Sequence, residues 1–254
     1  MLKLILLPIR FILLLIIAII AAILSMTLFY ITPPKLWHKV IIFFAKIILA
    51  VVGVRTHTIG RQEMNYAPIN TMIIANHMSW LDTIVMLSIY GVSFVGKIEM
   101  TKWPVINYLV RACGTIFIDR NNKRDILAAN KQLNQALNNG QCVGFFPEGK
   151  VNNGTELLSF KSSLFEVAMQ AKVNIIPIIL VYHYRNGQFA SDLLYAGNNL
   201  FQTIINTLRR SGDITAEINI LPTTECNNYP SRHELAIELH SKMESVYTQK
   251  IKSH

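Results

Sequence analysis

The chain has 254 residues, of which 52% are hydrophobic, and its mean hydropathy is +0.35. This composition excludes an ordinary soluble domain. The formal net charge is +9, but seven basic residues and no acidic residue precede Glu63, so the excess belongs to the apolar N-terminal part. No basic face with base-reading elements is found, which excludes nucleic acid as a partner. The three cysteines lack metal-binding spacing, so we predict neither a metal site nor a cofactor.

Residues 11–31 form a run of 21 residues without a charge. A helix of this length spans about 30 Å, the thickness of the hydrocarbon core of a bilayer. The apolar core of a cleaved signal peptide is shorter, with about 7–15 residues. We therefore predict a retained transmembrane anchor.

Residues 36–54 form a second apolar segment, which follows Pro33-Pro34 and contains Lys39 and Lys46. A charge at the bilayer centre costs about 2.5–3.5 kcal/mol, so we expect either a hairpin partner of the anchor or a helix at the membrane surface. The basic residues that flank both segments suit anionic lipid headgroups. Residues 1–54 are thus predicted to be a membrane-anchoring helical hairpin, and residues 55–254 the domain that carries the chemistry.

That domain alternates between two kinds of pattern. Apolar runs predict strands at residues 71–75, 115–118, 142–146, 174–182 and 214–221. Helical periodicity and stop signals predict helices at residues 125–137, 162–171 and 231–252. The alternation indicates an α/β fold, a largely parallel mixed sheet covered by helices. Pro177, inside an apolar run, is expected at an edge or a bend of the sheet.

His77 and Asp82 are the first candidates for chemistry, because His77 follows the predicted strand at residues 71–75. Histidine suits general base catalysis near neutral pH, and a carboxylate can orient it. Five residues on a regular helix turn through about 500°, so the two side chains meet only if His77 precedes a helix and Asp82 lies in its first turn. Ser79 is a good N-cap for such a helix. The alternative is that Asp82 only caps the helix and His77 is an ordinary loop residue.

Three further stretches follow in order: residues 114–120 (Gly-Thr-Ile-Phe-Ile-Asp-Arg), 146–149 (Phe-Pro-Glu-Gly) and 176–178 (Ile-Pro-Ile). With residues 76–82 (Asn-His-Met-Ser-Trp-Leu-Asp), they resemble the four motifs of the glycerolipid acyltransferases, the family that contains bacterial 1-acyl-sn-glycerol-3-phosphate acyltransferase. The similar region runs from about residue 71 to residue 181. Four motifs in the right order make a far more specific signal than any one of them.

The resemblance implies a role for each motif residue. His77 would be the general base and Asp82 would orient it. Arg120 would bind an anionic headgroup, while Glu148 and Gly149 would shape the acceptor pocket, with the carboxylate of Glu148 aimed into a cleft. Further headgroup candidates are Lys97 and Lys161.

The implied reaction moves an acyl chain from acyl-CoA or an acyl-carrier protein to the sn-2 hydroxyl of 1-acyl-glycerol-3-phosphate, giving phosphatidic acid for phospholipid biosynthesis. Residues 55–254 would then be the acyltransferase catalytic domain, attached to the bacterial inner membrane and facing the cytoplasm. We expect direct attack by the hydroxyl, without an acyl-enzyme. Backbone N–H groups near Ser79 are expected to stabilise the oxyanion.

One departure keeps a second acceptor open. Many family members continue the third motif with Thr-Arg, whereas this chain has Lys150-Val151. Residues 160–163 (Phe-Lys-Ser-Ser) also resemble the subgroup that acylates lyso-ornithine lipid, which carries no phosphate. More distant alternatives are a membrane-anchored lipid hydrolase that uses Ser79 and His77, and a lipid-binding protein without turnover.

Overall fold

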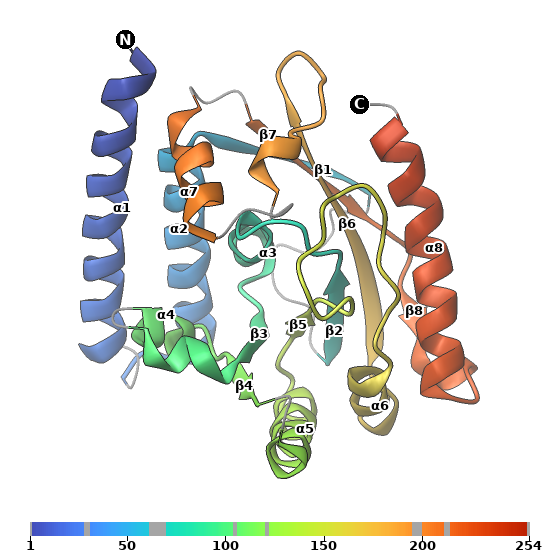
Figure 1. Ribbon diagram of the computed structural model, residues 1–254. Coiled ribbons are helices and arrows are strands. Elements are labelled where there is room, and N and C mark those ends of the chain that lie inside the picture. The colour runs from blue at the N-terminus through green and yellow to red at the C-terminus, as the bar shows by residue number, and fades with distance from the viewer. Residues whose placement is uncertain are drawn as a thin grey trace.

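A computed structural model describes residues 2–27, 31–60, 70–103, 106–119, 122–194, 200–210 and 214–252. Helices surround a central sheet (Figure 1). The α-helices are α1 (Leu2–Thr27), α2 (Pro34–Val52), α3 (Leu81–Tyr90), α4 (Ile106–Ala112), α5 (Lys123–Asn138), α6 (Ser163–Gln170), α7 (Leu200–Arg209) and α8 (Arg232–Lys252). Short 3-10 turns are η1 (Ile98–Lys102), η2 (Ser191–Leu193) and η3 (Cys226–Asn228).

The sheet has the order β1-β7-β6-β2-β5-β3-β4, with β8 paired to β6. The strands are β1 (Val54–Ile59), β2 (Thr71–Ala75), β3 (Ser93–Lys97), β4 (Ile116–Ile118), β5 (Val143–Phe145), β6 (Asn174–Tyr184), β7 (Ile214–Ile220) and β8 (Thr224–Glu225). The five strands from β6 to β4 run parallel, whereas β7 and β8 run antiparallel to β6. The predicted α/β fold with a largely parallel mixed sheet is confirmed.

Besides the two-residue β8, two strands had no signal in the sequence. β1 is an edge strand whose side chains are mostly exposed, so it lacks an apolar run. β3 contains Gly96 and ends in an exposed lysine, which also hides it from a search for apolar runs. Both strands form because each pairs with a parallel neighbour, β7 and β5 respectively.

Pro177 lies inside β6 and not at an edge of the sheet, so the first of the two expected positions, an edge, was wrong. Its carbonyl oxygen accepts a hydrogen bond from the N–H of Leu221 at 2.9 Å, so its own nitrogen faces the same side. On that side β8 pairs with β6 up to Ile175, and β7 begins to pair at Ile178. The proline falls at the junction between them, where the loss of one N–H donor leaves the pairing of β6 with β8 and with β7 in place.

Helix α1 differs sharply from the rest in exposure. Its stretch Leu6–Thr27 has a mean hydropathy of 2.9 and, by length and composition, can cross a membrane. It nevertheless contacts α2, α4 and α7. The Arg10 guanidinium donates hydrogen bonds to the carbonyl oxygens of Leu208 (3.2 Å) and Arg210, so the charge inside this apolar helix meets the negative end of α7.

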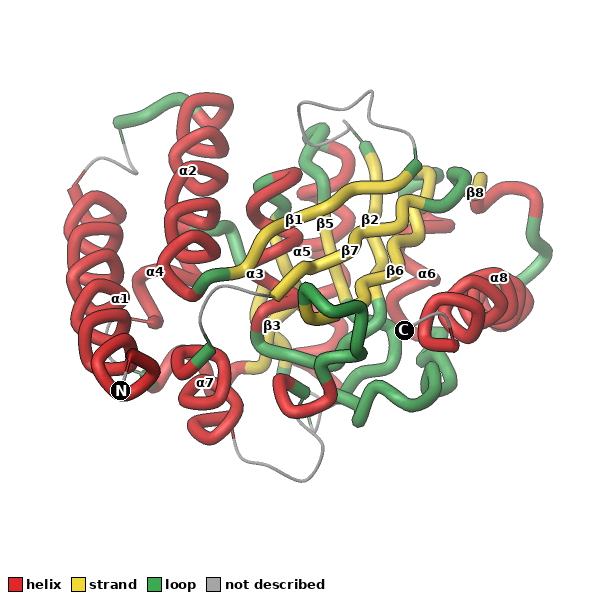
Figure 2. The backbone as a smooth tube through the Cα atoms, turned by 90° about the horizontal axis from the view of Figure 1, so that it is seen from above, coloured by secondary structure: helices red, strands yellow, loops and turns green. Residues whose placement is uncertain are grey.

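Helix α2 buries one face in the same hydrophobic core as the sheet. That face consists of Trp37, Ile41, Ala45, Leu49 and Val52. The Trp37 indole N–H donates to the carbonyl oxygen of Ala112 at 2.6 Å. Figure 2 shows α1 and α2 side by side at one end of the molecule, with α8 at the other. A division of the chain at residue 54 stays a prediction, and α2 contributes to the core on the far side of that division.

The buried face of α2 can be tested with neighbouring substitutions. Trp37 is 6% exposed and Leu36 is 53% exposed. We expect Trp37→Ala to lower the free energy of unfolding by about 3–5 kcal/mol, because it leaves a cavity and removes the bond to Ala112. Leu36→Ala is expected to change it by no more than about 0.5 kcal/mol. Denaturant unfolding in detergent, followed by circular dichroism, measures both, and equal small effects would show that α2 is not part of the core.

Candidate active site

The motif residues gather at one edge of the sheet because β2, β5, β3 and β4 are parallel. The carboxyl ends of parallel strands share an edge, where ligands of open α/β sheets usually bind. His77 follows β2, Glu148 follows β5, and Lys97 is the last residue of β3. Asp119 follows β4 at the same edge, and Arg120 lies outside the described residues.

The connection from β2 to α3 is held by side-chain hydrogen bonds. The fully buried side chain of Asn76 donates to the carbonyl oxygen of Leu180 (3.0 Å) and accepts from its N–H (2.7 Å). These two bonds continue the pairing of β2 with β6 past the end of β2 and direct the chain to His77. The helix then begins at Leu81, whose N–H donates to Ser79 Oγ at 3.3 Å. His77 therefore precedes the helix and Asp82 lies in its first turn, as their contact requires.

His77 Nδ1 lies 2.7 Å from Asp82 Oδ2. The same oxygen accepts from the N–H groups of Met78 (2.7 Å) and Ser79 (2.8 Å), and Oδ1 accepts from the Tyr182 hydroxyl (2.7 Å). Asp82 is fully buried, and a carboxyl group that accepts from the three donors Met78, Ser79 and Tyr182 is an ionised acceptor. Nδ1 therefore carries a proton, which leaves Nε2 of His77 as the basic nitrogen.

An aromatic stack orients the His77 ring. The Phe146 ring lies 4.0 Å from it at an interplanar angle of 11°, and Phe94 stacks on Phe146 at 5.5 Å. With one face covered and Nδ1 bonded, the imidazole has a single orientation. Its side chain remains 21% exposed, so it stays accessible from solvent.

Glu148 is almost completely buried, 2% exposed, and its carboxylate bonds to the protein. Oε1 accepts from the His77 N–H (2.7 Å), while Oε2 accepts from the Leu158 N–H (3.0 Å) and the Asn152 amide. The Asn152 N–H in turn donates to the His77 carbonyl oxygen at 2.8 Å. The acid thus joins the loop after β5 to the backbone of His77. A direct contact of Glu148 with an acceptor stays a prediction.

Gly149 has a φ of +73°, in the left-handed region that favours glycine. A Cβ atom there would lie 2.9 Å from Cδ of Lys161, so the lysine stem runs across the glycine. The backbone of Lys161 is fixed to the same turn, because its N–H donates to the Pro147 carbonyl oxygen at 2.9 Å. Lys161 and Lys97 are both exposed at the carboxyl edge of the sheet. The turn after β5 therefore presents a cation near the loop that Glu148 joins to His77.

The Ser79 side chain forms structural hydrogen bonds. It is 1% exposed, and its hydroxyl donates to the carbonyl oxygen of Leu193 at 3.1 Å. No hydrogen bond joins it to His77 among the described residues, as a nucleophile activated by that histidine would require. The N–H groups of Met78 and Ser79 are already bonded to Asp82, which leaves neither for an oxyanion. Stabilisation of the oxyanion by other N–H groups near Ser79 stays a prediction.

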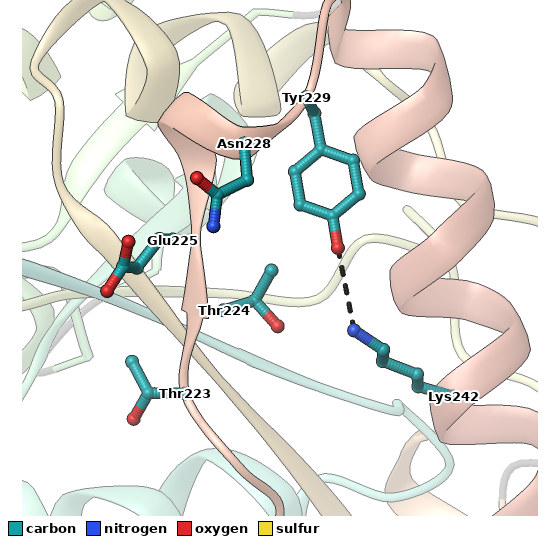
Figure 3. A pocket seen from close by; sticks show the side chains of 6 residues that line it. All are labelled: Thr223, Thr224, Glu225, Asn228, Tyr229 and Lys242. Carbon is teal, nitrogen blue, oxygen red and sulfur yellow. Dashed lines mark hydrogen bonds between the residues drawn. The ribbon is translucent and has the colours of Figure 1, made fainter.

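A polar hollow of about 260 Å³ lies elsewhere on the molecule (Figure 3). It is lined by Thr223, Thr224, Glu225, Asn228, Tyr229 and Lys242. Thr224 pairs with Ile175 near the amino end of β6, so the hollow is at the edge of the sheet opposite His77. It takes no part in the site built around that histidine.

Comparison with known proteins decides the family. The model of the family described as Acyltransferase matches residues 58–181, which contain all four motifs. A 1-acyl-sn-glycerol-3-phosphate acyltransferase from Neisseria gonorrhoeae is 30% identical over 213 residues, or 84% of this chain and 82% of that protein. The chain belongs to this acyltransferase family. The predicted family and enzyme class are confirmed.

One further relative and one solved structure are also similar to this acyltransferase. A lyso-ornithine lipid O-acyltransferase from Rhodobacter capsulatus is 28% identical over 210 residues, or 81% of this chain and 74% of that protein. The crystal structure of the 1-acyl-sn-glycerophosphate acyltransferase PlsC from Thermotoga maritima superposes with a TM-score of 0.66, covering 96% of this chain and 98% of that one. At 17% identity, that likeness supports the fold alone.

The structure adds residues that the sequence did not single out for the site. Phe146 stood inside a motif but was not assigned a contact with His77. Tyr182 lies just beyond the region matched by the family model, in a strand that reads only as a buried apolar run. Asn152 was assigned no role from the sequence, yet its side-chain amide donates to Glu148 and its backbone N–H donates to the carbonyl oxygen of His77.

The burial of Glu148 predicts a pH dependence of stability. Burial raises the pKa of its carboxyl above the ordinary 4.5, although its hydrogen bonds act in the opposite direction. A raised pKa in the folded state contributes stability below the unfolded pKa, and this contribution is lost as pH rises through the folded pKa. We therefore expect the stability of wild type relative to Glu148→Gln to fall as pH rises from about 4 to 8.

Thermal or denaturant unfolding of both proteins across that pH range measures the difference. Glu225→Gln, which removes an exposed carboxylate at the opposite edge, serves as the control for general charge effects. A difference that stays constant or grows with pH would contradict the expectation.

Proposed function

We propose that this acyltransferase transfers an acyl chain from acyl-CoA or an acyl-carrier protein to the sn-2 hydroxyl of 1-acyl-glycerol-3-phosphate, forming phosphatidic acid. The observation that carries the proposal is the 2.7 Å contact between His77 Nδ1 and the buried carboxylate of Asp82, at the carboxyl edge of the sheet. The relative from Neisseria gonorrhoeae, named for this reaction, supports the choice of acceptor.

In the proposed mechanism His77 Nε2 removes the proton of the acceptor hydroxyl as its oxygen attacks the thioester carbonyl. The C–O bond forms, the C–S bond breaks, and the imidazolium returns the proton to the departing sulfur. Asp82 stabilises the imidazolium through Nδ1. No acyl-enzyme is formed, which agrees with the structural bonds that occupy Ser79.

We further propose that the exposed Lys97 and Lys161 bind the phosphate of the acceptor. Both extend from the carboxyl edge of the sheet, Lys97 at the end of β3 and Lys161 across Gly149. Arg120 is retained in this group from the motif resemblance. Glu148 and Gly149 then shape the acceptor pocket indirectly, because one holds the His77 loop and the other lets Lys161 approach.

Lyso-ornithine lipid is the second candidate acceptor. Several relatives carry that name, among them the protein from Rhodobacter capsulatus. The position after Lys150 is Val151, whereas many family members have an arginine there. An apolar residue at this position suits a headgroup without phosphate.

We propose that residues 1–54 form the membrane-anchoring helical hairpin and residues 55–254 the catalytic domain. The apolar helix α1 and the lipid-modifying relatives indicate association with a membrane. We place the enzyme at the bacterial inner membrane with its site facing the cytoplasm. Acceptor and product both partition into the bilayer, so an anchored enzyme meets them by lateral diffusion.

The first test measures acyl transfer from a radiolabelled thioester to lysophosphatidic acid and, separately, to lyso-ornithine lipid. We expect His77→Ala to lower the rate by about 10²–10⁴-fold, because it removes the base. His57→Ala, an exposed histidine on the edge strand β1, is expected to retain the wild-type rate. Product from lyso-ornithine lipid only would move the assignment to the second acceptor, and full activity of His77→Ala would refute the mechanism.

The headgroup contacts have a separate test. We expect Lys97→Gln and Lys161→Gln each to raise KM for lysophosphatidic acid about tenfold, because each loses one hydrogen bond to a charged group. Their kcat should stay within a few-fold of wild type. Lys172→Gln is the control, since Lys172 is exposed at the opposite edge of the sheet, before β6. An unchanged KM in both site variants would remove these lysines from the site.

A further inference from the structure

Tyr182 brings a hydroxyl group to the carboxylate of Asp82 from a different part of the chain. It belongs to β6, which neighbours the strand that leads to His77, and it is fully buried. Its hydroxyl donates to Asp82 Oδ1 at 2.7 Å. The contact joins residues 100 positions apart in the sequence.

The two oxygens of Asp82 are held in different ways. Oδ2 accepts from three donors that all lie within five residues of Asp82, namely His77, Met78 and Ser79. For Oδ1, the donor within the described part of the chain is Tyr182. The tyrosine therefore fixes the oxygen that the local donors do not reach, and it shares the charge of the carboxylate with them.

The buried Tyr182 hydroxyl keeps its proton and so always donates a hydrogen bond to Asp82. Burial and the neighbouring charge of Asp82 raise the pKa of Tyr182 well above its ordinary value, so the phenol stays protonated. A residue that only filled this volume in the core could be phenylalanine. The hydroxyl costs free energy to bury unless it is bonded, and its bond goes to the group that orients His77.

We infer that Tyr182 is a positioning residue for acyl transfer. Its hydroxyl holds Asp82 in the geometry that orients His77, and it sets the strength of the hydrogen bond between His77 and Asp82. This inference rests on the proposed role of His77 as general base. Without the Tyr182 hydrogen bond, more of the carboxylate charge stays on Oδ2. The imidazolium then becomes more stable, and a larger fraction of His77 is protonated at a given pH.

The test is the pH profile of kcat/KM for full-length Tyr182→Phe, with an acyl-CoA and whichever of lysophosphatidic acid and lyso-ornithine lipid the wild type acylates. We expect the acid limb to move to higher pH by roughly 0.5–1 unit. The maximal kcat/KM should fall about tenfold, the size typical of residues that hold an active-site side chain in place by a hydrogen bond. Tyr90→Phe, at the other end of α3 and 2% exposed, removes a tyrosine hydroxyl without touching Asp82 and should leave the acid limb in place.

A second variant changes the strength of the same hydrogen bond without removing it. 3-Fluorotyrosine at position 182 retains the hydroxyl and makes it a stronger donor, so the acid limb should move to lower pH. Unshifted profiles for both the phenylalanine and the fluorotyrosine variants would overturn the inference, as would an equal shift in Tyr90→Phe. If His77→Ala keeps full activity, the proposed function itself fails. If His77→Ala is inactive and the Tyr182 variants are unshifted, only the positioning role is lost.

Discussion

The buried carboxylate of Asp82 is the group on which the rest of the site depends. A charge without solvent is costly unless donors surround it. The donors to Asp82 come from the connection between β2 and α3 and from the strand β6. Both segments must be in place before the charge is stable. The requirement that stabilises the fold here is therefore the same one that orients His77, and stability and geometry are coupled at this residue.

A second buried acid completes the arrangement from the other side. Asp82 holds the ring of His77, whereas Glu148 holds its backbone N–H and joins it to the loop after β5. That loop also places Gly149 and Lys161. Two carboxylates that look alike in the sequence thus act on different parts of one histidine, and the loop that carries Lys161 is joined to the backbone of His77.

The N-terminal helices pack against the part of the molecule that carries the site. Helix α1 exposes apolar side chains along most of its length, and α2 buries one face in the core beside α3. Because α3 begins with the turn that contains Asp82, α2 lies against the helix that carries the site. The orientation of the candidate site relative to α1 is thus determined by packing between α1, α2 and α3.

The sequence by itself determined the apolar strands, the N-terminal anchor candidate, the four motifs and the condition under which His77 and Asp82 can meet. These are local properties: runs, spacing and caps within a few residues. Only the tertiary structure decided that β1 and β3 pair as strands and that Pro177 lies where the partner of β6 changes from β8 to β7. It also decided that the Glu148 carboxylate accepts hydrogen bonds from backbone N–H groups. It alone brought Tyr182 to Asp82. Each of these depends on which groups become neighbours across the sheet, and no short stretch of sequence carries that information.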